Sequence, residues 1–131
     1  MVEWKRISRR KATGGIDNSV NSKTKSLSNR GGSFSKTTID SKNKVYKERT
    51  LGGNQKIKIS KVDTVIVSDS SKTMKAKILN VVENSANKHF VRQKVITKGA
   101  IIKVEIDGKE HTAKVTSRPG QTGQVSATLI K

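Results

Sequence analysis

The chain has 131 residues, of which 28 are lysine or arginine and ten are aspartate or glutamate, so its formal net charge is +18 at pH 7. It contains no cysteine, which excludes disulfides and thiolate zinc sites, and no apolar run approaches the ~18 residues that span a bilayer. The length allows one domain plus an extension. This composition favours a cytoplasmic protein with an anionic partner.

The first fifty residues are basic and poor in apolar side chains. They carry thirteen Lys or Arg against four Asp or Glu, and only eight Val, Ile, Leu or Met, whereas residues 51–131 hold twenty-three of the latter. Such a segment cannot bury enough apolar surface to offset the entropy of its own ordering. We therefore predict that residues 1–50 form an extended basic RNA-binding arm, with one short pairing segment at 44–49.

The start of this arm combines dense cations with one large aromatic side chain. Residues 4–11 contain five basic side chains and Trp4, and stacking of a base on an aromatic ring is typically worth ~1–3 kcal/mol. Arginine adds bidentate phosphate binding. The Gly14-Gly15 pair that follows would let the backbone approach RNA closely and turn. An RNA contact is favoured over an idle basic tail.

A border is predicted at Leu51-Gly52-Gly53-Asn54, after which short runs alternate between apolar and polar residues. Alternation with a period of two in β-branched residues is typical of half-buried strands. The expected faces are Ile57 with Ile59; Val62, Thr64 and Ile66 opposite Asp63, Val65 and Val67; and Met74, Ala76 and Ile78 opposite Lys75 and Lys77. The Gly-Gly-Asn sequence itself forms either a backbone nest for one phosphate or a plain turn.

The clearest local unit is a hairpin around Asp107-Gly108. This dipeptide between alternating runs favours a two-residue type I′ turn, because both central residues need positive φ. Glu105 then faces Glu110, a mild repulsion that diagonal lysines relieve. The other predicted pairs are Ile106 with Lys109, Val104 with His111, Ile102 with Ala113, and Ala100 with Val115.

The remaining elements complete a mainly β domain. Residues 84–89 are expected to form one short helical turn, Arg118-Pro119-Gly120 another turn, and residues 124–131 a closing strand through Val125, Ala127 and Leu129. Five or six short strands with one apolar face each predict a small closed β-barrel over residues 51–131, because closure removes exposed edges.

Neither a catalytic site nor a metal or cofactor site is expected. His89 and His111 are the only histidines, and neither has a second ligand at a usable spacing. Glu105 and Asp107 flank a hairpin turn, so they are read as solvated turn residues and not as an acid–base pair. The chain is therefore expected to bind and not to catalyse.

Five motifs carry a resemblance to a known family. In order along the chain they are Ser-Arg-Arg-Lys-Ala-Thr-Gly-Gly at 8–15, Leu-Gly-Gly-Asn at 51–54, Ala-Asn-Lys-His-Phe-Val-Arg at 86–92, Ile-Thr-Lys-Gly-Ala-Ile-Ile at 96–102 and Val-Thr-Ser-Arg-Pro-Gly-Gln at 115–121. With them the chain resembles the archaeal and eukaryotic-type small-subunit ribosomal protein eight family of the e-series, at the length of its archaeal members.

That resemblance implies a structural constituent of the small (30S) ribosomal subunit, with a β-barrel body and an arm threaded into ribosomal RNA, located in the cytoplasmic ribosome. Two features depart from the family pattern. Ala12 stands where the family has proline, and residues 16–38 are rich in Ser, Asn and Thr where the family has a dense basic run. Hydroxyls and amides can still bond phosphates and sugars there.

Small-subunit ribosomal RNA and neighbouring ribosomal proteins are the expected partners, without a membrane, a small-molecule substrate or homo-oligomers. The residues expected to contact RNA are Trp4, Lys5, Arg6, Ser8, Arg9, Arg10, Lys11, Thr13, Gly14, Gly15, Lys23, Lys25, Arg30, Arg49, Gly52, Gly53, Asn54, Lys56, Lys58, Lys88, His89, Arg92, Lys98 and Arg118.

Two other classes share this composition. A free RNA-binding barrel, such as an RNA chaperone or a translation accessory factor, would exchange on and off ribosomes at moderate salt. A polycation that acts on membranes or anionic glycans is the second alternative, but the sequence has no amphipathic helical stripe to support it.

Overall fold

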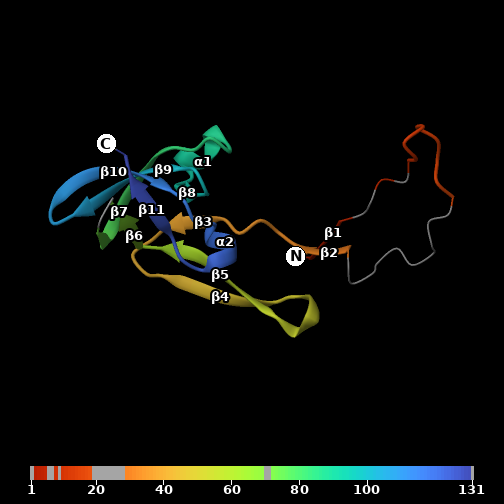
Figure 1. Cartoon of the computed structure of the whole chain (residues 1–131), viewed down its shortest axis with the longest axis horizontal. Coiled ribbons are helices and arrows are strands. Elements are labelled where there is room, and N and C mark those ends of the chain that lie inside the picture. The colour runs from red at the N-terminus through yellow and green to blue at the C-terminus, as the bar shows by residue number, and fades with distance from the viewer. Residues whose placement is uncertain (1, 6–7, 9, 19–28, 70–71, 131) are drawn as a thin grey trace. The chain divides into compact units, whose positions relative to one another are not determined.

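The computed structural model describes residues 2–5, 8, 10–18, 29–69 and 72–130 (Figure 1). Contacts divide the chain into two compact units, Met1–Phe34 and Ser35–Lys131. The border predicted from sequence lies after residue 50, so residues 35–50 of the predicted arm pack with the second unit. The extent of the RNA-binding arm remains a prediction.

The first unit contains a short antiparallel pair of strands. β1 (Val2–Trp4) pairs with β2 (Arg30–Gly32), with Val2 opposite Gly32 and Trp4 opposite Arg30. Just beyond β1, the amide of Lys5 donates to the carbonyl of Asn29 at 2.8 Å. The sequence shows no strand periodicity in this region, because a two-stranded ladder of three residues needs no apolar face to pair its backbone groups.

The second unit is built on a closed five-stranded barrel, which confirms the predicted fold class. Its strands are β6 (Thr64–Ser68), β7 (Thr73–Glu83), β9 (Ile101–Ile106), β10 (Lys109–Val115) and β11 (Ser126–Leu129), in the order β10-β11-β6-β7-β9. The β11–β6 pair is parallel and the others are antiparallel. The closing strand predicted at 124–131 is β11.

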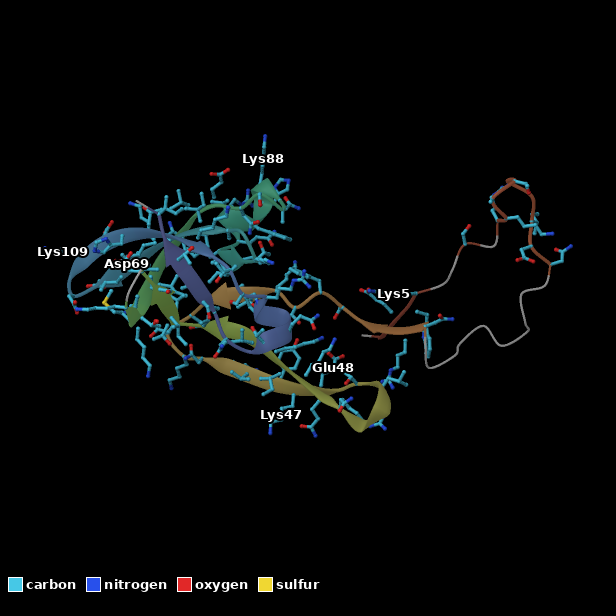
Figure 2. The ribbon with its side chains drawn as sticks, viewed as in Figure 1. Lys5, Lys47, Glu48, Asp69, Lys88 and Lys109 are labelled. Atoms are coloured by element: carbon cyan, nitrogen blue, oxygen red, sulfur yellow. The ribbon has the colours of Figure 1, made fainter. Side chains whose placement is uncertain are left out.

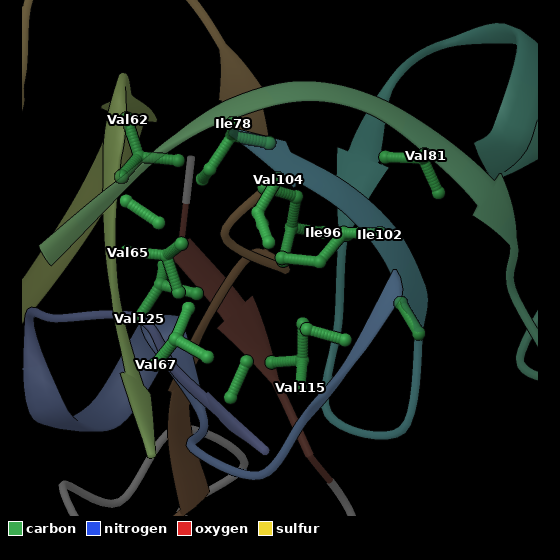
Figure 3. Packing of buried hydrophobic residues seen from close by; sticks show 14 of the residues in the cluster. Val62, Val65, Val67, Ile78, Val81, Ile96, Ile102, Val104, Val115 and Val125 are labelled. Carbon is green, nitrogen blue, oxygen red and sulfur yellow. The ribbon is translucent and has the colours of Figure 1, made fainter. Parts of the chain in front are cut away.

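The barrel interior is filled by β-branched residues that alternate along the strands (Figure 3). Val67, Ile102 and Val104 are fully buried, and Val125 and Ala127 bring the closing strand into the same cluster. Burying such a side chain contributes about 1.5–3 kcal/mol relative to leaving it exposed. This core makes the barrel a rigid support for its loops.

A second, four-stranded sheet adjoins the barrel. Its order is β4 (Lys44–Arg49), β5 (Gln55–Val62), β3 (Thr37–Ile39) and β8 (Val95–Ile96), with β3 parallel to β5. The pairing segment predicted at 44–49 is β4. The 3-10 turn η2 (Leu51–Gly53) joins β4 to β5 as an antiparallel hairpin.

The chain passes from this sheet into the barrel at Asp63. Asp63 lies between the two strands: its amide donates to Asn43 Oδ1 at 2.8 Å, and its carbonyl accepts from the amide of Ile78 at 2.9 Å. The single alternating strand predicted through 62–67 is therefore wrong: β5 ends and β6 begins on either side of this residue. The buried side chains are Val62, Val65 and Val67, because the break changes which residues face inward.

The Asp107-Gly108 hairpin between β9 and β10 is confirmed. Asp107 and Gly108 have φ values of 49° and 77°, as a type I′ turn requires. The strand register places Glu110 opposite Glu105, and the predicted pairs of 106 with 109, 104 with 111 and 102 with 113 are all present.

Two short helices lie in the loops of the second unit. The predicted helical turn at 84–89 begins later than expected, as α1 (Lys88–Arg92), because Asn87 caps it by accepting from the amide of His89 at 2.9 Å. α2 (Pro119–Thr122) occupies the predicted Arg-Pro-Gly turn. Neither helix, nor any other in the described residues, is long and apolar enough to cross a membrane.

Candidate nucleic-acid interface

In the first unit, a compact turn presents the Gly14-Gly15 motif. The carbonyl of Lys11 accepts from the amide of Gly14, and the amide of Lys11 donates to the carbonyl of Gly15, both at 2.9 Å. The Arg10 guanidinium donates to the carbonyl of Gly14 at 2.9 Å, and Gly14 has a φ of 87° that favours glycine. The turn closes with Ala12 inside it, so it does not require the proline of the family pattern.

Other predicted contacts surround this turn or lie on the two short strands. Trp4 is 37% exposed and stands directly opposite Arg30 across the β1–β2 pair. Lys5, Ser8 and Thr13 are exposed as well. The predicted contacts Arg6, Arg9, Lys23 and Lys25 lie outside the described residues.

In the second unit, the Leu-Gly-Gly-Asn motif is the turn of the β4–β5 hairpin. The amide of Thr50 donates to the carbonyl of Asn54 at 2.7 Å, and Gly52 and Gly53 have φ values of 78° and 77°. The turn is exposed, and Leu51 is 75% exposed at its start. A plain hairpin turn accounts for the motif, and a phosphate nest in the same loop remains a prediction.

The cations next to this turn differ in their surroundings. Arg49 and Lys56 are exposed. Lys58, in contrast, forms an ion pair with Glu48, and only 13% of its side chain is exposed. Because this lysine is already paired with a carboxylate, it is less suited to phosphate than its neighbours.

A third group of cations lies on the loop between β7 and β9. Asn84, which is only 5% exposed, fixes this loop. Its Nδ2 donates to the carbonyl of Val95 at 3.1 Å, and its Oδ1 accepts from the amide of Ala86 and the hydroxyl of Thr97, both at 3.0 Å. The loop therefore has a defined shape without a regular core of its own.

The fixed loop is cationic throughout. Residues 84–100 contain no Asp or Glu, and the predicted contacts Lys88, His89, Arg92 and Lys98 are all exposed. Figure 2 shows Lys88 extending outward from α1. Lys94 is also exposed and has a φ of 52°. The sequence analysis did not select Lys94, although the lack of carboxylates in this stretch could have pointed to it.

Arg118 stands at the start of α2. Its side chain is exposed, while its carbonyl accepts from the amides of Gln121 and Thr122 at 2.9 and 3.0 Å and from the Thr122 hydroxyl at 3.0 Å. The backbone carbonyl of Arg118 thus stabilises the turn, while the side chain of Arg118 stays exposed.

The barrel wall, by comparison, neutralises much of its own charge. Lys103 binds Glu110 at 3.4 Å, and the register places Lys77 beside Glu105. Lys103 is a diagonal neighbour of the kind expected to relieve the pairing of Glu105 with Glu110, and Lys77 adds a cation directly opposite Glu105. Cations without nearby carboxylates therefore concentrate on the 84–100 loop, whereas at the β4–β5 turn Arg49 is exposed and Lys56 lies opposite Glu48.

One further ion pair lies at the end of β3. Lys61 Nζ donates to Asp40, and this hydrogen bond, together with those from Ser41 and the charge of Lys61, lowers the pKa of Asp40 below its ordinary value of 3.8. Both side chains are solvent-accessible, so the pair contributes little to folding. Its effect is to remove one cation from the surface available to an anion.

Among the residues that the structure describes, no three His, Cys, Asp or Glu side chains are grouped so that they could hold an ion. The candidate sites of the two units thus share one chemistry: exposed cations lie beside backbone amides and side-chain hydroxyls, which are groups that hydrogen-bond to phosphate and ribose.

Comparison with known proteins identifies the family. The family model described as Ribosomal protein S8e matches residues 4–130. Small ribosomal subunit protein eS8 of Methanococcus aeolicus is 46% identical over 129 residues, covering 97% of this chain and 96% of the relative. The proteins of the same name from Methanosarcina barkeri and Methanococcus vannielii are 39% and 41% identical, each covering 99% of this chain and 100% and 98% of the relative.

These matches confirm the family that the five motifs indicate, and with it the prediction of a ribosomal protein and not an enzyme. They extend over both compact units and include the arm. The chain therefore belongs to the ribosomal protein S8e family.

Proposed function

We propose that this chain is a structural constituent of the small ribosomal subunit and binds ribosomal RNA through its basic arm and the loops of its barrel unit. The observation that carries the proposal is the concentration of exposed cations on two loops of the barrel unit, the β4–β5 turn and the 84–100 loop, in a chain whose relatives are named small-subunit proteins. Its location is the ribosome in the cytoplasm, beside other ribosomal proteins.

The barrel acts as a rigid support. The buried Asn84 side chain holds the 84–100 loop in a fixed position on this support, so the cations of that loop lose little freedom when they meet phosphate. Recognition of structured RNA depends mainly on shape, phosphates and 2′-hydroxyls. Lys88, Arg92 and Lys98 on the loop, and Arg49 and Lys56 beside the turn, supply that kind of contact.

The arm supplies a second contact. The turn closed by Arg10 and Lys11 brings several exposed polar groups to one tip, and Trp4 offers a partly exposed ring for stacking. Arg6 and Arg9 extend the same cationic sequence. The arm orders further when RNA neutralises its charge, because its own apolar content is too small to fold it.

Neutralising part of the arm tests this proposal. In Arg9→Gln/Arg10→Gln/Lys11→Gln, loss of up to three phosphate contacts should lower the slope of log K against log salt by about 2–3, at roughly 0.7–0.9 per contact. The assay is filter binding of the full chain to small-subunit ribosomal RNA over a series of KCl concentrations. An unchanged slope would show that these residues do not touch phosphate.

A further inference from the structure

β4 is the edge strand of the four-stranded sheet in the second unit. It stands first in the order β4-β5-β3-β8, and among the described residues its only strand partner is β5. Figure 1 shows it along the lower margin of that unit. The strand at the other end of the sheet, β8, has both of its residues buried. An open edge presents unpaired amides and carbonyls, so β4 offers backbone groups that another strand can bind.

The register of the hairpin determines which backbone groups of β4 face the open edge. The amide of Thr50 donates to the carbonyl of Asn54 at 2.7 Å, so these residues form a hydrogen-bonded pair beside the turn. Such pairs alternate along an antiparallel ladder with pairs that exchange no hydrogen bonds. Even-numbered residues of β4 therefore bond to β5, and the odd-numbered ones face outward. We call these outward groups the β4 edge, and they belong to Val45, Lys47 and Arg49.

The far side of β5 agrees with this alternation. Ile59 lies opposite Val45 in the register, and its carbonyl accepts from the hydroxyl of Thr37 in β3 at 2.7 Å. The carbonyl of Ile59 therefore points away from β4, as it must in a pair that exchanges no hydrogen bonds. The amide and carbonyl of Val45 point away from β5 for the same reason.

The protection of the β4 edge relies on charge. Proteins block open edges with proline, very short strands, bulges or charged side chains. β4 has six residues and no proline, and its one register shift lies at its start, between Lys44 and Val45. Lys47 and Arg49 are exposed and, being two residues apart, share one face of the strand. These cations repel another basic edge, including β4 of a second copy, but attract an acidic one.

A groove lies beside the first residue of the β4 edge. It has a volume of about 180 Å³, and Val45, which is 49% exposed, forms part of its wall. The other apolar residues that line it are Ile59, Val62, Val65, Ile66 and Val125. On an added strand, the side chain opposite Val45 has its Cβ about 4.5–5.5 Å from that of Val45. The groove therefore favours an apolar side chain at this position of the partner.

We propose that the β4 edge binds an extended acidic segment of another protein by strand addition. Acidic side chains of the segment lie opposite Lys47 and Arg49, and an apolar side chain lies opposite Val45. In this mode of recognition, main-chain hydrogen bonds supply affinity and the alternate side chains supply specificity. A protein partner goes beyond the proposed RNA binding, which uses cationic side chains and not the backbone of an edge strand. Arg49 enters both assignments, so the tests below act on the backbone of the edge and on Lys47.

Peptide binding to the full chain tests the main-chain hydrogen bonds. The probe is fluorescein-labelled Thr-Glu-Thr-Glu-Thr-Val-Thr, whose glutamates and valine have the expected spacing in an antiparallel strand. One isomer is N-methylated at both glutamates and the valine, whose amides would face β4, and the other at three threonines, whose amides would face away. The first isomer should bind at least tenfold more weakly than the second in fluorescence anisotropy. Because the isomers have equal charge, equal affinities would show that charge alone attracts the peptide and would overturn the proposal.

Amide hydrogen exchange locates the added strand. With the unmethylated peptide bound, the amides of Val45, Lys47 and Arg49 should exchange at least tenfold more slowly. The amides of Tyr46 and Glu48 already bond to β5 in the ladder, so their exchange should change less. Slowing that is equal at odd and even positions, or absent at the odd ones, would contradict strand addition at this edge.

A pair of substitutions at Lys47 separates backbone from charge. Lys47→Pro and Lys47→Gln remove the same charge, but only proline removes the outward amide, and proline is tolerated at an edge where the amide faces solvent. Peptide affinity should fall at least fivefold more in the proline variant, with matching Tm values as the check on folding. Small-subunit RNA should bind both variants equally. A larger loss of RNA binding in Lys47→Pro would assign the edge to RNA and overturn the protein assignment.

Photo-cross-linking in small subunits identifies the source of the segment. The chain has no cysteine, so Lys47→Cys accepts a single benzophenone, and Lys109→Cys carries the same group at the β9–β10 turn as a control. Position 47 should cross-link a polypeptide at a stretch with acidic residues at alternate positions, and position 109 should not reach that stretch. Cross-links from position 47 to RNA alone, or to the same stretch from both positions, would contradict the proposal.

The two assignments can fail separately. If the unsubstituted chain binds small-subunit RNA no better than an unrelated RNA of equal length, the proposed function fails, while the peptide and exchange measurements on the purified chain still decide the β4 edge. If RNA binding is specific and sensitive to the arm substitutions, but the two peptide isomers bind equally, only the strand addition fails.

Discussion

Replacing Asn84 with alanine should loosen the cationic 84–100 loop and destabilise the barrel unit. The side chain is 5% exposed and makes three hydrogen bonds, to Val95, Ala86 and Thr97, at 3.0–3.1 Å. At a net ~1 kcal/mol for each hydrogen bond, Asn84→Ala should lower the free energy of unfolding by about 3 kcal/mol. For a unit of this size that corresponds to a fall in Tm of about 12–24 °C.

Thermal unfolding of the full chain, followed by far-ultraviolet circular dichroism, measures this loss. Asn87→Ala is the matched control in the same loop, because the exposed Asn87 side chain makes one capping hydrogen bond, and loss of a cap costs about 0.5–2 kcal/mol. A loss for Asn84→Ala below ~1 kcal/mol, or no larger than that of the control, would refute the view that Asn84 fixes the loop.

Three further predictions concern the packing and charge of the barrel unit. Ile102→Ala should lower the free energy of unfolding, measured in urea, by about 2–5 kcal/mol because Ile102 is fully buried. The control Ile130→Ala, at an exposed position, should lower it by less than half as much. Equal losses would contradict the assigned core. Gly123→Ala should lower the free energy of unfolding by about 1–3 kcal/mol, since φ of Gly123 is 69° and a Cβ there would overlap Ile57. The double variant Gly123→Ala/Ile57→Ala should recover part of that loss. If the losses of the two single variants simply add in the double variant, the overlap is not the cause. Asp40→Asn should unfold slightly more easily than the unsubstituted chain above pH 4, because the pKa of Asp40 is lowered in the folded state. This difference in stability should disappear as the pH falls through that lowered pKa. A difference in stability that grows on acidification would contradict the prediction.

The parts of the fold that the sequence predicts are those determined by local chemistry. Asp107-Gly108 dictates a turn type by itself, and the register of β9 and β10 follows from it. The alternation of Met74, Ala76 and Ile78 likewise places one face of β7 in the barrel. Neither inference needs information from distant residues.

The parts that sequence reasoning misses depend on distant contacts. β3 is three residues long and is held by residues of β5 and β8 that lie more than twenty residues away from their partners along the chain. The break at Asp63 depends on Asn43 and Ile78. The break at Asp63 interrupts a pattern that otherwise reads as continuous alternation, and β3 lies in a polar stretch without a strand pattern, so no local window of sequence can show either feature.

The candidate interface shows the same division. Composition is enough to select the basic motifs, but it treats all lysines alike. Lys58 was selected from sequence although Glu48 is its partner, while the exposed Lys47 on the same hairpin was not. Which cations stay available to an anion depends on cross-strand register, and that register was not predictable before β4 and β5 were known to pair.

Sucrose-gradient sedimentation of a native lysate, followed by a high-salt wash and detection of this protein, tests the central claim most directly. A structural constituent of the small subunit should migrate with that subunit and remain with it after the wash, because the proposed RNA contacts involve both the arm and the loops of the barrel unit. Release of the protein to the light fractions at modest salt would contradict the account and identify a factor that binds RNA only transiently.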